Sequence, residues 1–176
     1  HPDLAANYLG GYDFVNGDND PMDDHGHGTH CAGIIAAMNN DYGSVGVGPD
    51  IGIYGLKVLS SSGYGSFSDI IAGIEWAIYG PDGVEGNDDD AEVISLSLGA
   101  SYTSSSLEAI CSEAYQRGSL VVAAAGNSGT SDGTGDNVMY PARYDSVVAV
   151  AATDYNNIRA YFSSTGPAVE VSAPGV

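Results

Sequence analysis

Blocks of apolar and polar residues alternate along the 176-residue chain. Consecutive apolar, largely β-branched positions predict strands at 53–59, 91–98, 120–125 and 147–152. Apolar positions spaced three and four residues apart predict helices at 68–79 and 104–117, the second of which ends at Gly118. Strands that are apolar at consecutive positions are typical of burial on both faces. The pattern therefore predicts an α/β fold with a mainly parallel sheet covered by helices.

The loops between these elements are rich in Gly, Asn, Asp and Ser, and no repeat is visible. The length is in the usual range for one domain. The chain begins at His1 rather than at Met, and it stops at Val176 directly after an apolar, strand-like run. We therefore expect neither end to be a natural terminus.

The net charge of −19 comes from 23 acidic residues against four Lys and Arg. Such a chain repels phosphate backbones, which argues against nucleic acid as a partner. The apolar runs are shorter than the roughly 20 residues of a membrane helix, so we expect no membrane partner. Lys57 is the only lysine, and clustered Asp residues repel each other unless salt screens them. The composition favours a protein adapted to brine, with an ordinary acidic secreted protein as the alternative.

Two cysteines, Cys31 and Cys111, lie far apart in the sequence within apolar helical patterns. This spacing is unlike a disulfide framework or a structural zinc motif. We expect two free thiols that pack as small apolar side chains, with a single bridge as the alternative.

Residues 23–33, Asp-Asp-His-Gly-His-Gly-Thr-His-Cys-Ala-Gly, hold the densest chemistry. The apolar pattern from Cys31 onward is helical, which places His27 in the first turn of a helix. The positive end of the helix dipole disfavours an imidazolium there, so the neutral imidazole is available as a base. His27 is therefore the candidate general base, whereas we expect His30 to pack or hydrogen-bond structurally.

Zinc binding is the alternative for this segment. The potential ligands are His25, His27, His30, Asp23, Asp24 and Cys31. The zinc-protease helix has histidines at i and i+4 with a Glu between them, whereas this segment has i and i+3 spacing and no Glu. The sequence favours the general base.

Asn127 is the second candidate, in Ala-Ala-Ala-Gly-Asn-Ser-Gly at 123–129. It follows a predicted buried strand, and α/β folds place ligands at the carboxyl ends of their parallel strands. A side-chain amide there can donate an N–H to a developing oxyanion. By itself, Gly-Asn after a strand is also typical of a simple turn.

Together, residues 27–33 and 123–129 resemble the blocks around the catalytic histidine and the oxyanion-hole asparagine of the subtilisin-like serine proteases. The chain is most similar to the secreted halolysins of halophilic archaea. Further matching segments follow in family order at 1–4, 39–40, 46–47, 56–59, 73–77, 97–99, 140–142, 162–164 and 173–175.

The resemblance implies a three-layer fold and a serine endopeptidase in which His27 and Asn127 are catalytic. In this family the triad Asp precedes the segment that resembles 1–4, and the triad Ser follows the one that resembles 173–175. We therefore interpret 1–176 as the central part of a catalytic domain, incomplete at both ends and inactive by itself. Ser131 is followed by Asp-Gly rather than Met-Ala, so we interpret it as a loop residue. The alternative function is a non-catalytic calcium-binding module on the same scaffold.

The resemblance also implies that an extended peptide substrate is held as an added strand between residues 63–65 and 97–99, beside a primary specificity pocket walled by 97–100 and 124–126. The implied substrate-binding residues are Gly63, Tyr64, Gly65, Ser97, Leu98, Gly99, Ala124, Ala125 and Gly126. Met139 is expected near the base of the primary specificity pocket, where the family often has a small residue, and Phe67 at a more distant apolar subsite.

Residues 38–44 resemble the tight calcium site of the family. The implied ligands are the side chains of Asp3 and Asn40 and the carbonyls of Met38, Tyr42 and Ser44. A weaker cation site is implied at the carbonyls of Ala142, Tyr144 and Val147, with Glu170. The remaining expectations are a secreted monomer that acts on proteins or peptides and is made with a propeptide.

Overall fold

The structure is a computed structural model that describes residues 1–84 and 86–176. The chain folds as two compact units, His1–Gly73 and Ile74–Val176. The first unit contains the 3-10 helix η1 (Pro2–Leu4), strand β1 (Tyr8–Asp13), helix α1 (His27–Ala36) and strand β2 (Ile53–Lys57). Helix α2 (Phe67–Tyr79) runs from the first unit into the second. The second unit continues with β3 (Val93–Leu96), α3 (Ser105–Arg117), β4 (Leu120–Ala124), β5 (Val147–Thr153) and β6 (Val169–Pro174).

The first unit is built on the parallel pair of β1 and β2, in which Asp13 lies opposite Lys57. The two backbones approach closely at Gly11, where a Cβ would collide with the Gly55 carbonyl. The side chain of Asn7, just before β1, donates to Ala36 O (2.8 Å) and Pro49 O (2.7 Å). This amide therefore fastens the end of helix α1 to the start of the sheet.

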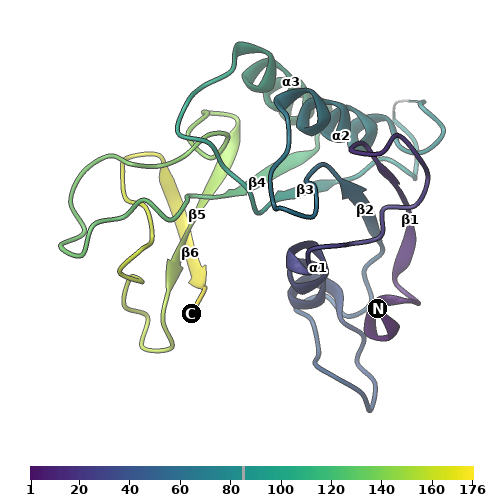
Figure 1. Ribbon diagram of the computed structural model, residues 1–176, viewed down its shortest axis with the longest axis horizontal. Helices are drawn as coiled ribbons and strands as arrows, with labels where there is room; N and C mark the ends of the chain where they lie inside the picture. The colour runs from purple at the N-terminus through teal and green to yellow at the C-terminus, as the bar shows by residue number, and fades with distance from the viewer. Residues whose placement is uncertain (85) are drawn as a thin grey trace. The chain divides into compact units, whose positions relative to one another are not determined.

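The second unit has a four-stranded parallel sheet in the order β3-β4-β5-β6 (Figure 1). Helix α3 packs against β4 and β5. It begins after Ser104, whose Oγ accepts from Leu107 N (3.3 Å), and it ends at Gly118 in the left-handed conformation. The core residues are Ile94, Leu96, Leu107, Ile110, Ala114, Val121, Ala123, Val147 and Ala149. Burial of these side chains holds the carboxyl ends of β3 and β4 side by side.

The predicted α/β class and the parallel strand pairing are confirmed. Both predicted helices form, and each predicted strand forms in part or in full. The strands divide between two sheets, one in each unit. Strand β1 lacks the apolar run that predicts a strand, because Gly10 and Gly11 stand at its centre, and close backbone approach selects Gly11.

Both cysteines are free thiols, as expected. Cys31 is half-buried on α1, and Cys111 is buried on α3. Burial, with a smaller contribution from the charge of Glu108, raises the pKa of Cys111 to about 12. Among the residues described, helices long and apolar enough to span a membrane are absent.

Candidate active site

His27 is the first residue of helix α1, as the sequence predicts. Gly26 directly before it has a φ of 98°, in the left-handed region where a side chain would be strained. The His27 imidazole is exposed, and its ring centroid lies 6.4 Å from that of His25 in an edge-on arrangement. The histidine thus stands at the positive end of the helix with its side chain on the surface.

Asp23 fixes the turn that leads into α1. Its Oδ1 accepts from the backbone N–H groups of His25 (3.0 Å) and Gly26 (2.8 Å). Its Oδ2 accepts from Thr29 N (2.8 Å) and Thr29 Oγ1 (2.7 Å). Burial would raise the pKa of Asp23, but these hydrogen bonds outweigh it and hold the pKa far below 3.8. An ionised carboxylate therefore caps the helix that carries His27.

The zinc alternative is not supported. Within 1–84 and 86–176, the structure forms no group of three or more His, Cys, Asp or Glu side chains suited to a metal ion. The Cys31 thiol instead lies one helical turn from His27, with 3.9 Å between Sγ and Nε2. The expected packing role of His30 is wrong, since its side chain is exposed on the surface of α1.

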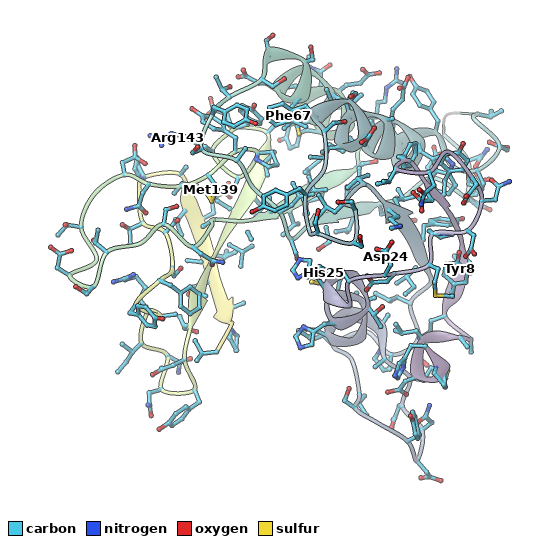
Figure 2. All side chains as sticks on the ribbon, in the orientation of Figure 1. Tyr8, Asp24, His25, Phe67, Met139 and Arg143 are labelled. Carbon is cyan, nitrogen blue, oxygen red and sulfur yellow. The ribbon has the colours of Figure 1, made fainter. Side chains whose placement is uncertain are left out.

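Lys57 joins the sheet of the first unit to the segment before α1. Its Nζ lies 3.0 Å from Asp13 Oδ2 and 3.0 Å from Asp24 Oδ2. The side chains of Lys57 and Asp13 are only 10% and 2% exposed. Burial would raise the pKa of Asp13, but hydrogen bonds from Asn16, Lys57 and Val15 lower it to about 2. Figure 2 labels Asp24 beside His25 on the segment that enters α1.

This ion cluster was missed by the sequence analysis. The chain contains one lysine and 23 acidic residues, so charge does not indicate which acids pair with Lys57. The only available signal is that Asp13 and Lys57 end two strands, and those strands had to be paired first.

Asn127 follows β4 at the carboxyl edge of the second sheet, as predicted. Its side chain is exposed and makes no hydrogen bond to any residue that the structure describes. The flanking backbone is anchored instead: Ser164 N donates to Gly126 O (2.9 Å), and Ser128 N donates to Ser164 Oγ (3.1 Å). The amide is therefore free to donate while its backbone is held. Ser131 lies in a turn beyond it, as expected for a loop residue.

Met139 lies between two glycines of the predicted substrate-binding set. A Cβ on Gly126 would lie 2.6 Å from Met139 Sδ, and a Cβ on Gly99 would lie 3.1 Å from Met139 Cβ. Met139 N also donates to Ala125 O (2.9 Å). The thioether therefore fills the space beside the ends of β3 and β4 (Figure 2). The structure brings Gly99, Ala125, Gly126 and Met139 together.

The other predicted substrate-binding residues are surface and loop positions. Ser97 and Ala124 are exposed and Leu98 is half-buried. Gly63–Gly65 follows the turn at 61–62 after β2, where Ser60 N donates to Tyr64 O (2.8 Å), and Tyr64 is 80% exposed. Their contacts with substrate remain a prediction.

The predicted calcium ligands meet around Asp3, whose residue is 3% exposed. Asp3 Oδ1 accepts from Asn40 Nδ2 (3.1 Å), and Asp3 Oδ2 accepts from Ser44 N (3.1 Å). Asn40 Oδ1 accepts from Tyr42 N (2.7 Å), and Met38 N donates to Asp3 O (3.0 Å). The Asp3 carboxylate is thus buried, and both of its oxygens accept from N–H groups of the segment that resembles the calcium site. Carboxylate, amide and carbonyl oxygens are the ligands that calcium prefers, and their binding of calcium here remains a prediction.

At the weaker predicted cation site, the Tyr144 carbonyl already accepts from Val147 N (3.0 Å), and Glu170 is exposed on β6. Cation binding there remains a prediction.

Comparison with known proteins gives one consistent family. The model of the subtilase family matches residues 1–176. The chain is 47% identical to subtilisin DY of Bacillus licheniformis and 48% identical to subtilisin Savinase of Lederbergia lenta, in each case over all of this chain and 60% of the relative. It is 45% identical to thermitase of Thermoactinomyces vulgaris, over 99% of this chain and 58% of the relative. The chain thus spans less than two thirds of the length of these relatives.

Proposed function

Since the chain belongs to the subtilase family, we propose that the complete protein is a serine endopeptidase and that residues 1–176 form the central part of its catalytic domain. Two observations support the proposal: a histidine with an exposed side chain at the start of α1, and an amide after β4 that makes no hydrogen bond to any residue that the structure describes. By resemblance to the family, His27 is proposed as the base and Asn127 as a donor in the oxyanion hole.

The roles of these two groups follow from acyl-transfer chemistry. A serine located after Val176 attacks the peptide carbonyl, and His27 accepts its proton and returns it to the leaving amine. An aspartate located before His1 orients the His27 ring. Asn127 donates its side-chain N–H to the oxyanion of the tetrahedral intermediate, where charge develops. Asp23 supports His27 by keeping the first turn of α1 closed.

The substrate is proposed to be an extended segment of a protein or peptide. Main-chain groups of Gly63–Gly65 and Ser97–Gly99 bind its backbone as an added strand, a mode that accepts many sequences. Met139 fills the space between Gly99 and Gly126, which leaves room for small side chains such as Gly, Ala or Ser before the cleaved bond. Phe67 is proposed to line a more distant apolar subsite.

Calcium is the proposed structural cofactor. Asp3 and Asn40 would hold it with their side chains, and Met38, Tyr42 and Ser44 with their carbonyls. The support is that the buried Asp3 carboxylate already meets Asn40 and the 42–44 loop. When bound, calcium supplies charge compensation for Asp3 and crosslinks η1 to the loop after α1.

The setting of the enzyme is proposed from its charge. A net charge of −19 with one lysine suits a secreted enzyme of the halolysin type that works in brine, where salt screens the acidic loops. A propeptide and a monomeric mature form complete the proposal.

The test is kinetic and uses the complete gene product. His27→Ala should abolish peptide hydrolysis, and Asn127→Ala should lower kcat by about 10² to 10³ with KM nearly unchanged. His25→Ala is the matched control, because it removes the neighbouring exposed histidine and should retain activity. A folded protein that binds calcium but hydrolyses no peptide would favour the non-catalytic module. Hydrolysis restored by zinc and not by calcium would favour the zinc alternative.

A further inference from the structure

The Arg159 guanidinium donates hydrogen bonds to backbone carbonyls of two segments, 160–163 and 130–131. Its Nη1 donates to Ala160 O (2.9 Å), Tyr161 O (3.2 Å) and Ser163 O (2.8 Å). Its Nη2 donates to Thr130 O (2.7 Å) and Ser131 O (3.5 Å). Although the chain has 23 acidic residues, Arg159 forms no ion pair with a carboxylate in the part of the chain that the structure describes. The guanidinium is thus used as a multidentate backbone donor.

The loop that leaves Asn127 folds over this guanidinium. Thr130 O accepts from Arg159 and also from Gly133 N (3.0 Å). A Cβ on Gly133 would lie 3.2 Å from both Nε and Nη2 of Arg159, and Gly133 has a φ of 69°. A planar fork with five N–H donors can satisfy carbonyls on both sides, whereas the point charge of a lysine cannot reproduce that geometry.

The same two segments are joined again immediately beside Asn127. Gly129 N donates to Phe162 O (2.9 Å), and Ser164 bonds both Gly126 O and Ser128 N. Ser164 is fully buried, at 0% exposure. Asn127 has no hydrogen bond of its own among the described residues, so its position depends on these flanking anchors. An oxyanion donor has to be held in place to be effective, and displacements near 1 Å can cost about 10²-fold in rate.

We propose that Arg159 is a positioning residue for the oxyanion-hole amide of Asn127. It clamps the loop after Asn127, at Thr130 and Ser131, onto the 160–163 turn, and so prevents that loop from lifting away from the sheet edge. The inference rests on the proposed function, because it assigns Arg159 a role in the same reaction step.

The experiment is a double-mutant cycle in the complete protein. Arg159→Lys should lower kcat by about tenfold or more with KM nearly unchanged. In the Asn127→Ala background the same change should lower kcat by less than about twofold, because the donor that it positions is already absent. Arg117→Lys is the matched control: it makes the same chemical change on α3, where Arg117 pairs with Glu113 (2.9 Å), and should leave kcat unchanged.

Two outcomes overturn the inference. If Arg159→Lys lowers kcat by the same factor in the wild-type and Asn127→Ala backgrounds, the arginine acts on overall stability or on a group other than Asn127. An unchanged kcat in Asn127→Ala would refute the oxyanion role itself, and that result is distinct from the first. Arg159→Met removes the charge as well and should give a larger loss with the same dependence on Asn127. If it does not fold, Arg159→Lys carries the test.

Discussion

Removing the Asp23 carboxylate should destabilise the turn that presents His27. Asp23→Ala deletes acceptors for four donors: the N–H groups of His25, Gly26 and Thr29 and the Thr29 hydroxyl. The His25 and Gly26 bonds are exposed, so water replaces those acceptors. The Thr29 bonds are partly buried at the start of α1, so their loss resembles the loss of a helix N-cap.

The expected magnitude follows from that division. Loss of an N-cap acceptor typically costs about 0.5 to 2 kcal/mol, and hydrogen bonds to an ionised group lie at the upper end. We expect the free energy of unfolding at pH 7 to fall by about 1 to 2 kcal/mol. The folded-state pKa of Asp23 lies well below 3.8. Its stabilisation is therefore present above pH 3.8 and is lost as the pH falls toward the lowered pKa.

The assay is urea unfolding of the complete protein in the His27→Ala background, which prevents self-digestion. Asp23→Ala should be less stable than its parent at pH 7, and the gap should narrow below pH 3.8. Asp20→Ala is the matched control, since Asp20 is an exposed acid on the same segment and should have little effect at either pH. The cap is refuted if Asp23→Ala costs no more than Asp20→Ala, or if its cost does not change with pH.

Three further predictions concern the pocket, the thiols and the calcium loop. Met139→Gly should open the space beside Gly126. The ratio of kcat/KM for a peptide with Phe before the cleaved bond to that for the matching Ala peptide should then rise at least about tenfold, and an unchanged ratio would contradict the pocket assignment. Methylmercury should abolish peptide hydrolysis by the complete protein through Cys31, whose Sγ lies 3.9 Å from His27 Nε2, and Cys31→Ser should resist the reagent. Cys111→Ser is the control: because Cys111 is buried, its substitution should not protect the activity. Calcium chelation should lower the melting temperature of the wild type by about 5 °C or more. It should hardly change that of Asp3→Asn, which replaces the buried carboxylate of the proposed site by an amide, and equal shifts in the two proteins would exclude Asp3 as a ligand.

Local patterns were enough to predict the main elements of the fold. The apolar periodicity of 104–117 with Gly118 after it is a local signal, and α3 forms at Ser105–Arg117. Strand β1 escapes such analysis because Gly11 at its centre is selected by close approach to the backbone of Gly55, which is a tertiary contact. The strands of one α/β chain also fall into two sheets, which the one-dimensional pattern does not encode.

The candidate site was predictable where chemistry and position coincide in one short segment. His27 at a helix start and Asn127 after a strand are examples. The supporting contacts are long-range and were not predictable: Lys57 lies 33 residues from Asp24, and Arg159 lies 29 residues from Thr130. The packing role predicted for His30 was wrong, since its side chain is exposed. The spacing of residues along one helix does not show which of them other parts of the chain cover.

The most direct test of the central claim is labelling of the complete protein by a fluorophosphonate, followed by mass spectrometry of its peptides. The account predicts a single modified serine located after Val176, and loss of that labelling together with all peptide hydrolysis in His27→Ala. Peptide hydrolysis that survives His27→Ala, or a folded protein in which no serine is labelled, would contradict it.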